Sequence, residues 1–141
     1  MIGHLRGFLA RHPWSVGGVY LFALFMTFVY LPYDVFVKPL RVGIAGAEEV
    51  WLGFRLTGWP AKWTEPLHWM IYAGLARGFY LERPWAWTCA SLYTVQVAIA
   101  SVVWVLLYAD YGPVGQVGTV LVVGLFLALA AQLWRARPQP A

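Results

Sequence analysis

The stretch EPLHWMIYAGLARGFYLERP, residues 65–84, decides the fold, because it must be assigned either to a membrane or to water. It is mostly apolar and aromatic, yet it carries His68 and Arg77. Pro66 stands near its start and the charged ERP closes it, a pattern typical of a helix with defined ends. The environment of this helix, membrane or water, follows from the composition of the whole chain.

The composition places the chain in a membrane. Of its 141 residues, 61% are hydrophobic and only 11% are charged, and the mean hydropathy is +0.63. These values lie far outside the range of soluble globular proteins. Three stretches, 15–33, 84–109 and 111–134, contain no charged residue, and a helix needs roughly 20 residues to cross a bilayer. Because an open chain in lipid satisfies its backbone hydrogen bonds only as a helix, we expect helices there.

We therefore predict an all-α membrane protein with four transmembrane helices, at 14–36, 63–82, 84–109 and 112–135. They should form an antiparallel bundle and a single domain, 1–141. The long loop between the first two helices is too apolar for a free linker, so we expect a short helix there, lying over the mouth of the bundle. Glu48 and Glu49 in this loop are candidates for the rim of that mouth, or are simply solvated.

The basic residues favour cytoplasmic termini. Six arginines flank the two termini and the turn between the second and third helices, against four basic residues in the long loop. By the positive-inside rule, both termini should be cytoplasmic. The high Trp, Gly and Ala content suggests a bacterial inner membrane. The net charge of +4 follows from this topology, so we expect no nucleic-acid partner. Cys89 is the only cysteine, which excludes an internal disulfide.

Polar residues of the expected helices share narrow faces. With about 100° between successive residues of a helix, Glu65, His68 and Tyr72 fall on one face. Polar side chains within a membrane are costly unless they pair or face a cavity. We therefore expect a pocket between the first three helices, with an acidic mouth and aromatic walls. Its candidate ligand-binding residues are Asp34, Glu65, His68, Trp69, Tyr72, Tyr93, Gln96 and Trp104.

Each of these residues also has a simpler explanation. Glu65 could be a carboxylate that the helix dipole favours at an N-terminus, and His68 could make a structural hydrogen bond. Arg77 could be an anchor whose side chain reaches the cytoplasmic headgroups. Tyrosines and tryptophans near helix ends are also typical of an interfacial belt. The sequence leaves these alternatives open.

Several chemistries lack the residues they need. Three histidines cannot supply a di-iron cluster, and one cysteine cannot run quinone-linked disulfide chemistry. The chain has no glycine-rich phosphate loop and no Ser/His/Asp spacing typical of a hydrolase. We expect no metal site and no cofactor.

Three sequence elements stand out by their order and spacing. They are TFVYLPYDVFVKPL at 27–40, EPLHW at 65–69 and PWAWTCASLYTVQ at 84–96. Together they resemble the EXPERA family, whose members include the emopamil-binding sterol isomerase and the sigma-2 receptor. The resemblance implies a four-helix bundle whose cavity binds sterols or cationic amphiphilic molecules. It also implies that Asp34 holds the amine, with Glu65 as a second candidate. The isomerases carry Glu four residues after a His, whereas here Tyr72 follows His68.

The sequence is compatible with three functions. The first is a small membrane protein that binds a sterol-like or cationic amphiphilic lipid in an intramembrane pocket. The second is a lipid double-bond isomerase in which His68 is the acid or base, Glu65 its partner, and Trp69 or Trp104 stabilises a cation by its ring face. The third is an accessory subunit of a larger membrane complex. The expected partners are a hydrophobic or amphiphilic small molecule and membrane lipid, and a homodimer stays open.

Overall fold

The computed structural model describes residues 2–108 and 112–138, and the chain is mostly helical. In chain order its elements are α1 (Ile2–Arg11), α2 (Trp14–Phe25), two π-helical turns (Met26–Tyr30 and Tyr33–Val37), α3 (Lys38–Val42), a 3-10 turn (Ile44–Gly46), β1 (Glu48–Trp51), β2 (Phe54–Thr57), α4 (Trp59–Tyr80), α5 (Pro84–Leu107) and α6 (Gly112–Arg135).

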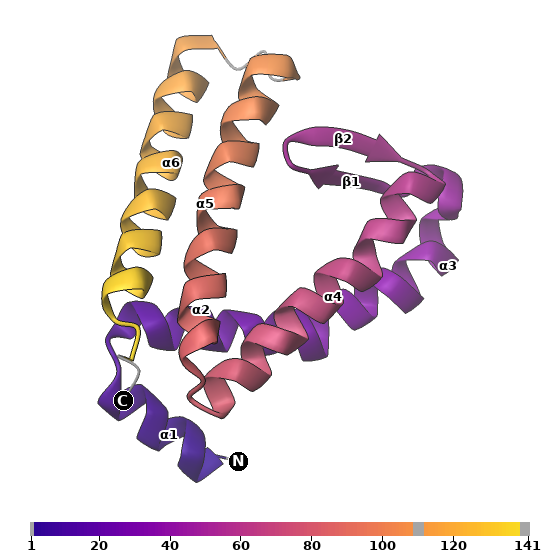
Figure 1. Cartoon of the computed structure of the whole chain (residues 1–141). Coiled ribbons are helices and arrows are strands. Elements are labelled where there is room, and N and C mark those ends of the chain that lie inside the picture. Colours follow the sequence, from indigo (N-terminus) through magenta and orange to yellow (C-terminus); the bar gives the residue numbers. More distant parts are fainter. Residues whose placement is uncertain (1, 109–111, 139–141) are drawn as a thin grey trace.

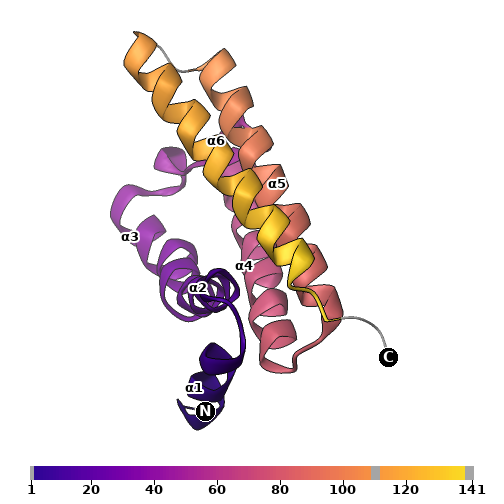
Figure 2. The same ribbon diagram turned by 90° about the vertical axis from the view of Figure 1, so that its left-hand side faces the viewer.

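The long helices form two pairs that diverge. In Figure 1, α5 and α6 run side by side, whereas α2 and α4 run at a steep angle to them and meet them only at the lower end. The view turned by 90° shows the same separation of α2 and α3 from the α5–α6 pair (Figure 2). The predicted antiparallel bundle is therefore too simple, because only one end of it is closed.

The closed end holds the hydrophobic core. Phe8 of α1, Phe79 of α4 and Trp87 of α5 are fully buried, and their rings meet at centroid distances of 4.9 to 6.3 Å. Gly78 lets α4 approach α5 closely, since a Cβ there would lie 2.7 Å from the Cβ of Ala86. Burying side chains of this size is the main favourable contribution to folding at this end.

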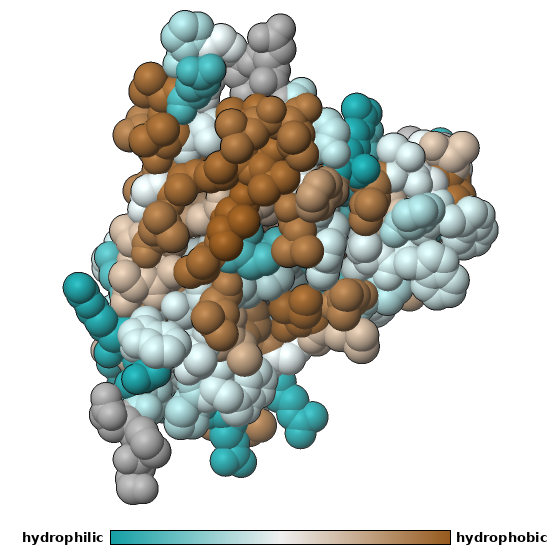
Figure 3. All heavy atoms as spheres, turned by 45° about the horizontal axis from the view of Figure 1, so that its top comes forward, coloured by the Kyte–Doolittle hydropathy of each residue, from teal (hydrophilic) through white to brown (hydrophobic). Residues whose placement is uncertain are grey.

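Three of the described helical segments are long and apolar enough to cross a membrane: Trp14–Arg41, Pro84–Leu107 and Gly112–Arg135. The predicted fourth span, now α4, is not among them. The surface of α6 is strongly apolar, and Figure 3 shows large brown areas of hydrophobic residues on this face of the molecule. The helix α1 and the end of α6 lie at the same end (Figure 1).

The short helix predicted for the apolar part of the loop is not found at 48–57, where Glu48–Trp51 and Phe54–Thr57 form an antiparallel hairpin. Its two-residue turn, Leu52–Gly53, has positive φ at both positions, 52° and 87°, as the tightest hairpin turns require. The turn rests on α5, where a Cβ on Gly53 would lie 2.3 Å from the Cβ of Val103. The hairpin therefore reaches from α4 across to α5.

The first membrane helix is interrupted at Pro32. In a π-helical turn the carbonyl of residue i accepts from the N–H of residue i+5, so the carbonyl of Thr27 would need the N–H that Pro32 lacks. Trp69 of α4 supplies the missing donor, with its indole Nε1 2.9 Å from the Thr27 oxygen.

Pro39 creates the same deficit one segment later. Its missing N–H would bond the carbonyl of Val35 in an α-helical register or that of Asp34 in a π-helical one. The ammonium of Lys62 lies 3.1 Å from the Asp34 oxygen and 3.4 Å from the Val35 oxygen. Side chains of α4 thus satisfy backbone groups that would otherwise be unpaired in an apolar environment.

Candidate functional site

A cavity of about 690 Å³ lies between the diverging helix pairs. This is within the usual range for small-molecule sites, roughly 300–1,000 Å³. Its walls come from the two π-helical turns, β1, α4, α5 and α6, and they are mostly aliphatic and aromatic. An apolar lining with a few polar groups is typical of small-molecule sites.

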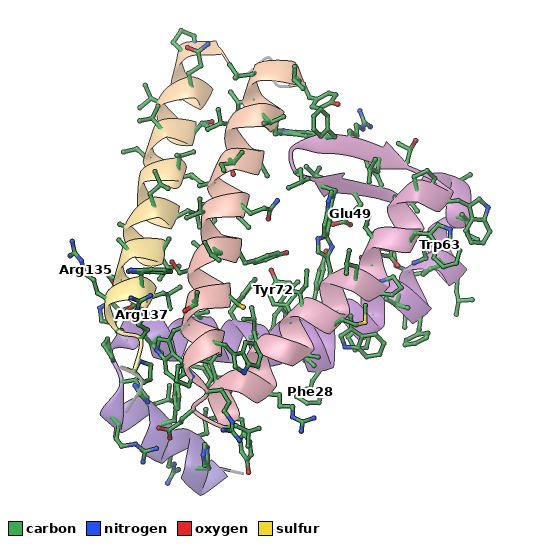
Figure 4. All side chains as sticks on the ribbon, viewed as in Figure 1. Phe28, Glu49, Trp63, Tyr72, Arg135 and Arg137 are labelled. Atoms are coloured by element: carbon green, nitrogen blue, oxygen red, sulfur yellow. The ribbon has the colours of Figure 1, made fainter. Side chains whose placement is uncertain are left out.

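Glu49 and His68 form the polar centre of this cavity. The Oε1 atom of Glu49 lies 3.7 Å from Nδ1 of His68, and Trp51 packs over the imidazole with ring centroids 4.6 Å apart. Burial raises the pKa of the Glu49 carboxyl, and the negative charge of nearby Asp34 raises it further. In Figure 4, Glu49 and Tyr72 both project into the space between α4 and α5.

The other carboxylates near the cavity are paired with lysines. Asp34 is buried, and its Oδ1 lies 2.6 Å from Nζ of Lys38, one turn further along. Glu65 is buried as well and pairs with Lys62. Among the described residues, no lysine or arginine lies within ion-pair distance of Glu49, and the basic group beside it is the imidazole of His68. Glu49 is therefore the carboxylate of the cavity whose charge is left without a lysine or arginine.

Six of the eight predicted ligand-binding residues line the cavity. Helical spacing had placed these residues on inward faces, and their side chains face the cavity in the structure. They are Asp34, His68, Tyr72, Tyr93, Gln96 and Trp104.

Glu65 and Trp69 do not belong to the lining. The carboxylate of Glu65 is bound to Lys62, and the indole N–H of Trp69 is bound to the carbonyl of Thr27. Trp69 therefore joins α4 to the first membrane helix. Glu65 holds Lys62 of the same helix α4, and the Lys62 ammonium reaches the carbonyls of Asp34 and Val35. The structure does not support Glu65 as the partner of His68, since Glu49 occupies that position from the hairpin.

Sequence reasoning underestimated Glu49, which it placed only among candidates for the rim. The hairpin that carries it has a signal in the sequence, a glycine in the middle of the apolar run VWLGFRL at 50–56. The lysine pairs also had a local signal, since Lys38 is four residues after Asp34 and Lys62 three residues before Glu65. Gly115 and Gly118 of α6 also line the cavity, and no pattern in the sequence indicated this.

Comparison of this chain with protein-family models, curated proteins and solved structures finds no match.

Proposed function

We propose that this membrane protein binds an amphiphilic, lipid-sized molecule in the cavity between its two helix pairs. The observation that carries this proposal is the cavity itself, about 690 Å³ with apolar walls and the Glu49–His68 pair among them. An accessory subunit would need no such cavity. The resemblance to the EXPERA family points to the same class of ligand, a sterol-like or cationic amphiphilic molecule.

The charge balance changes which residue would hold a cationic head. Asp34, the residue that the resemblance implies, is already neutralised by Lys38 at 2.6 Å. Glu49 faces the cavity with no basic partner except His68. A charged group in a poorly solvated site favours an opposite charge, so Glu49 is the counter-charge that a protonated amine would meet.

The isomerase remains the second candidate, with a different pair of residues. Proton transfer needs an acid and a base within reach of the same substrate carbon. His68 and Glu49 both line the cavity and lie 3.7 Å apart, so they replace the predicted pair of His68 and Glu65. Conversion of a sterol double bond by the wild type, lost in His68→Gln with binding retained, would favour this candidate over a binding protein.

We further propose that α4 is the fourth span and that both termini are cytoplasmic, in a bacterial inner membrane. The arginines at the terminal end support this orientation, and Arg6, Arg77, Arg83 and Arg135 are exposed there. In a variant with Cys89 replaced by serine, single cysteines at positions 3 and 139 should react alike with a membrane-impermeant reagent in sealed cells. Unlike labelling would contradict an even number of spans.

The binding proposal can be tested by filling the cavity. Gly118 lines it, and a Cβ at this position meets nothing within 4 Å, so Gly118→Leu places a side chain where its first carbon has open space. Energy transfer from tryptophan to a pyrene-tailed long-chain amine, and to the alcohol of the same chain, measures affinity in lipid nanodiscs. The variant should weaken binding of both probes roughly tenfold, equivalent to about two displaced methylene groups.

Gly124→Leu is the matched control. Gly124 also lies on α6 with open space around its Cβ, and it does not line the cavity. Its affinity for both probes should equal that of the wild type. Non-saturable binding by the wild type, or equal affinities of the two leucine variants, would remove the proposal.

A further inference from the structure

A second, smaller cavity lies deeper between the helices. Its volume is about 180 Å³, and residues of α2, α4, α5 and α6 surround it. The lining is aliphatic and aromatic except for Thr94 and the two tyrosines. Leu75, Ala90 and Leu129, together with Tyr72 and Tyr93, are among the residues that line it.

The polar group of Thr94 is already satisfied. Its hydroxyl donates to the carbonyl of Ala90 at 2.8 Å, so it offers no free donor to a bound molecule. Cavities with apolar walls of this kind stay dry and accept apolar guests, because a water molecule inside them would lack hydrogen-bond partners. The occupant that fits this space is therefore a hydrocarbon group.

The two cavities share a wall. Among the described residues, Tyr72, Tyr93 and Val97 line both of them. The rings of Tyr72 and Tyr93 meet edge to face with centroids 5.6 Å apart, so this pair forms part of the wall that separates the cavities. Rotation of a tyrosine side chain is a local motion that needs no movement of the helices. A narrow, flexible chain could then pass where a rigid ring system could not.

We propose that the smaller cavity is the tail-binding subsite of the larger one, and that the ligand is an amphiphile with a linear hydrocarbon chain. This inference rests on the proposed function and chooses between its ligand classes, since a flexible chain passes between two side chains more readily than the rigid fused rings of a sterol. The head lies by Glu49 and His68, and the end of the chain lies between Leu75, Ala90 and Leu129. A methylene group is about as large as a water molecule, roughly 30 Å³ in the liquid, so the subsite holds about six of them.

The test is the dependence of affinity on chain length. A series of primary alcohols compete with the pyrene-tailed alcohol for the protein in nanodiscs. Each added carbon that enters a cavity should raise affinity roughly fourfold, until both cavities are full. Comparing variants at each length removes the partition of the alcohol into lipid, because that partition is the same for all of them.

Two variants should move this limit in opposite directions. Ala90→Leu fills the smaller cavity, so affinity should stop rising about three carbons earlier than in the wild type. Leu129→Ala enlarges the cavity, so affinity should continue to rise for about three more carbons. Ala128→Leu is the control, because Ala128 is exposed on α6 and lines neither cavity. If overpacking prevents Ala90→Leu from folding, Leu129→Ala still decides the question.

The outcomes separate the two proposals. If affinity stops rising at the same chain length in the wild type, Ala90→Leu and Leu129→Ala, while Gly118→Leu still weakens binding, the proposal of a tail subsite is overturned. Cholesterol that competes as well as the best alcohol would overturn it as well. If Gly118→Leu has no effect on any alcohol, the cavity is not the binding site and the proposed function itself fails.

Discussion

Replacing Glu49 by glutamine should weaken binding of a cationic amphiphile while leaving a neutral one unaffected. Glutamine keeps the size of the side chain and removes its charge. The Glu49 side chain is 26% exposed, which places its contact between a solvated ion pair, worth about 0–1 kcal/mol, and a desolvated charged hydrogen bond, worth about 1.5–3 kcal/mol. We therefore expect a loss of about 1–2 kcal/mol, or roughly five- to thirtyfold in affinity.

The assay compares the pyrene-tailed amine with the alcohol of the same chain, so that the hydrocarbon contribution cancels. Glu48→Gln is the control, because Glu48 is the preceding residue of the same strand but is exposed and bound to Arg55 at 2.7 Å. The double replacement Asp34→Asn with Lys38→Met removes both charges of a neutral pair, so it should change the affinities of both probes alike. An unchanged ratio of amine to alcohol affinity in Glu49→Gln would refute this reasoning.

The same contact predicts a pH dependence. Burial raises the pKa of the Glu49 carboxyl, and only the ionised carboxylate attracts an amine. Affinity for the amine should therefore fall as the pH drops through this raised pKa, at a higher pH than an ordinary carboxyl would give. By linkage, the bound amine lowers the pKa of Glu49. The alcohol should show no such step, and neither should the amine with Glu49→Gln.

Three further predictions concern the elements that shape the cavity. Lys62→Met leaves the Glu65 carboxylate, which is 4% exposed, without its partner. It should lower the free energy of unfolding by about 3–5 kcal/mol. The double variant Lys62→Met with Glu65→Gln should recover part of this stability, as measured by thermal unfolding. Trp69→Phe removes one hydrogen bond to the backbone and should cost about 1–3 kcal/mol, measured in the same way; an unaltered melting temperature would contradict the role given to its indole. Gly53→Ala should detach the hairpin from α5 and weaken binding of the amine more than Gly43→Ala does. Gly43 has a similar φ of 68°, but a Cβ there would meet nothing within 4 Å. Equal effects of the two variants on amine affinity would mean that backbone strain alone is responsible.

Local patterns in the sequence were sufficient for three of the four predicted membrane helices and for most of the predicted cavity residues. Long runs without charge determine which segments are compatible with lipid, because each charged group in hydrocarbon is costly. Helical spacing likewise placed Tyr72, Tyr93 and Gln96 on inward faces, and all three line the cavity. These properties depend on neighbours within one or two helical turns, which the order of residues specifies directly.

Only the tertiary structure decided which carboxylate is available to a ligand. Asp34, Glu65 and Glu49 have the same chemistry, and they differ in whether a lysine lies beside them. The position of Glu49 depends on the hairpin turn, which rests on Val103 of α5, about fifty residues further along the chain. Contacts at such separations leave no period in the sequence. They arise when elements pack, and packing also determines that the helix pairs diverge around a cavity rather than close into a bundle.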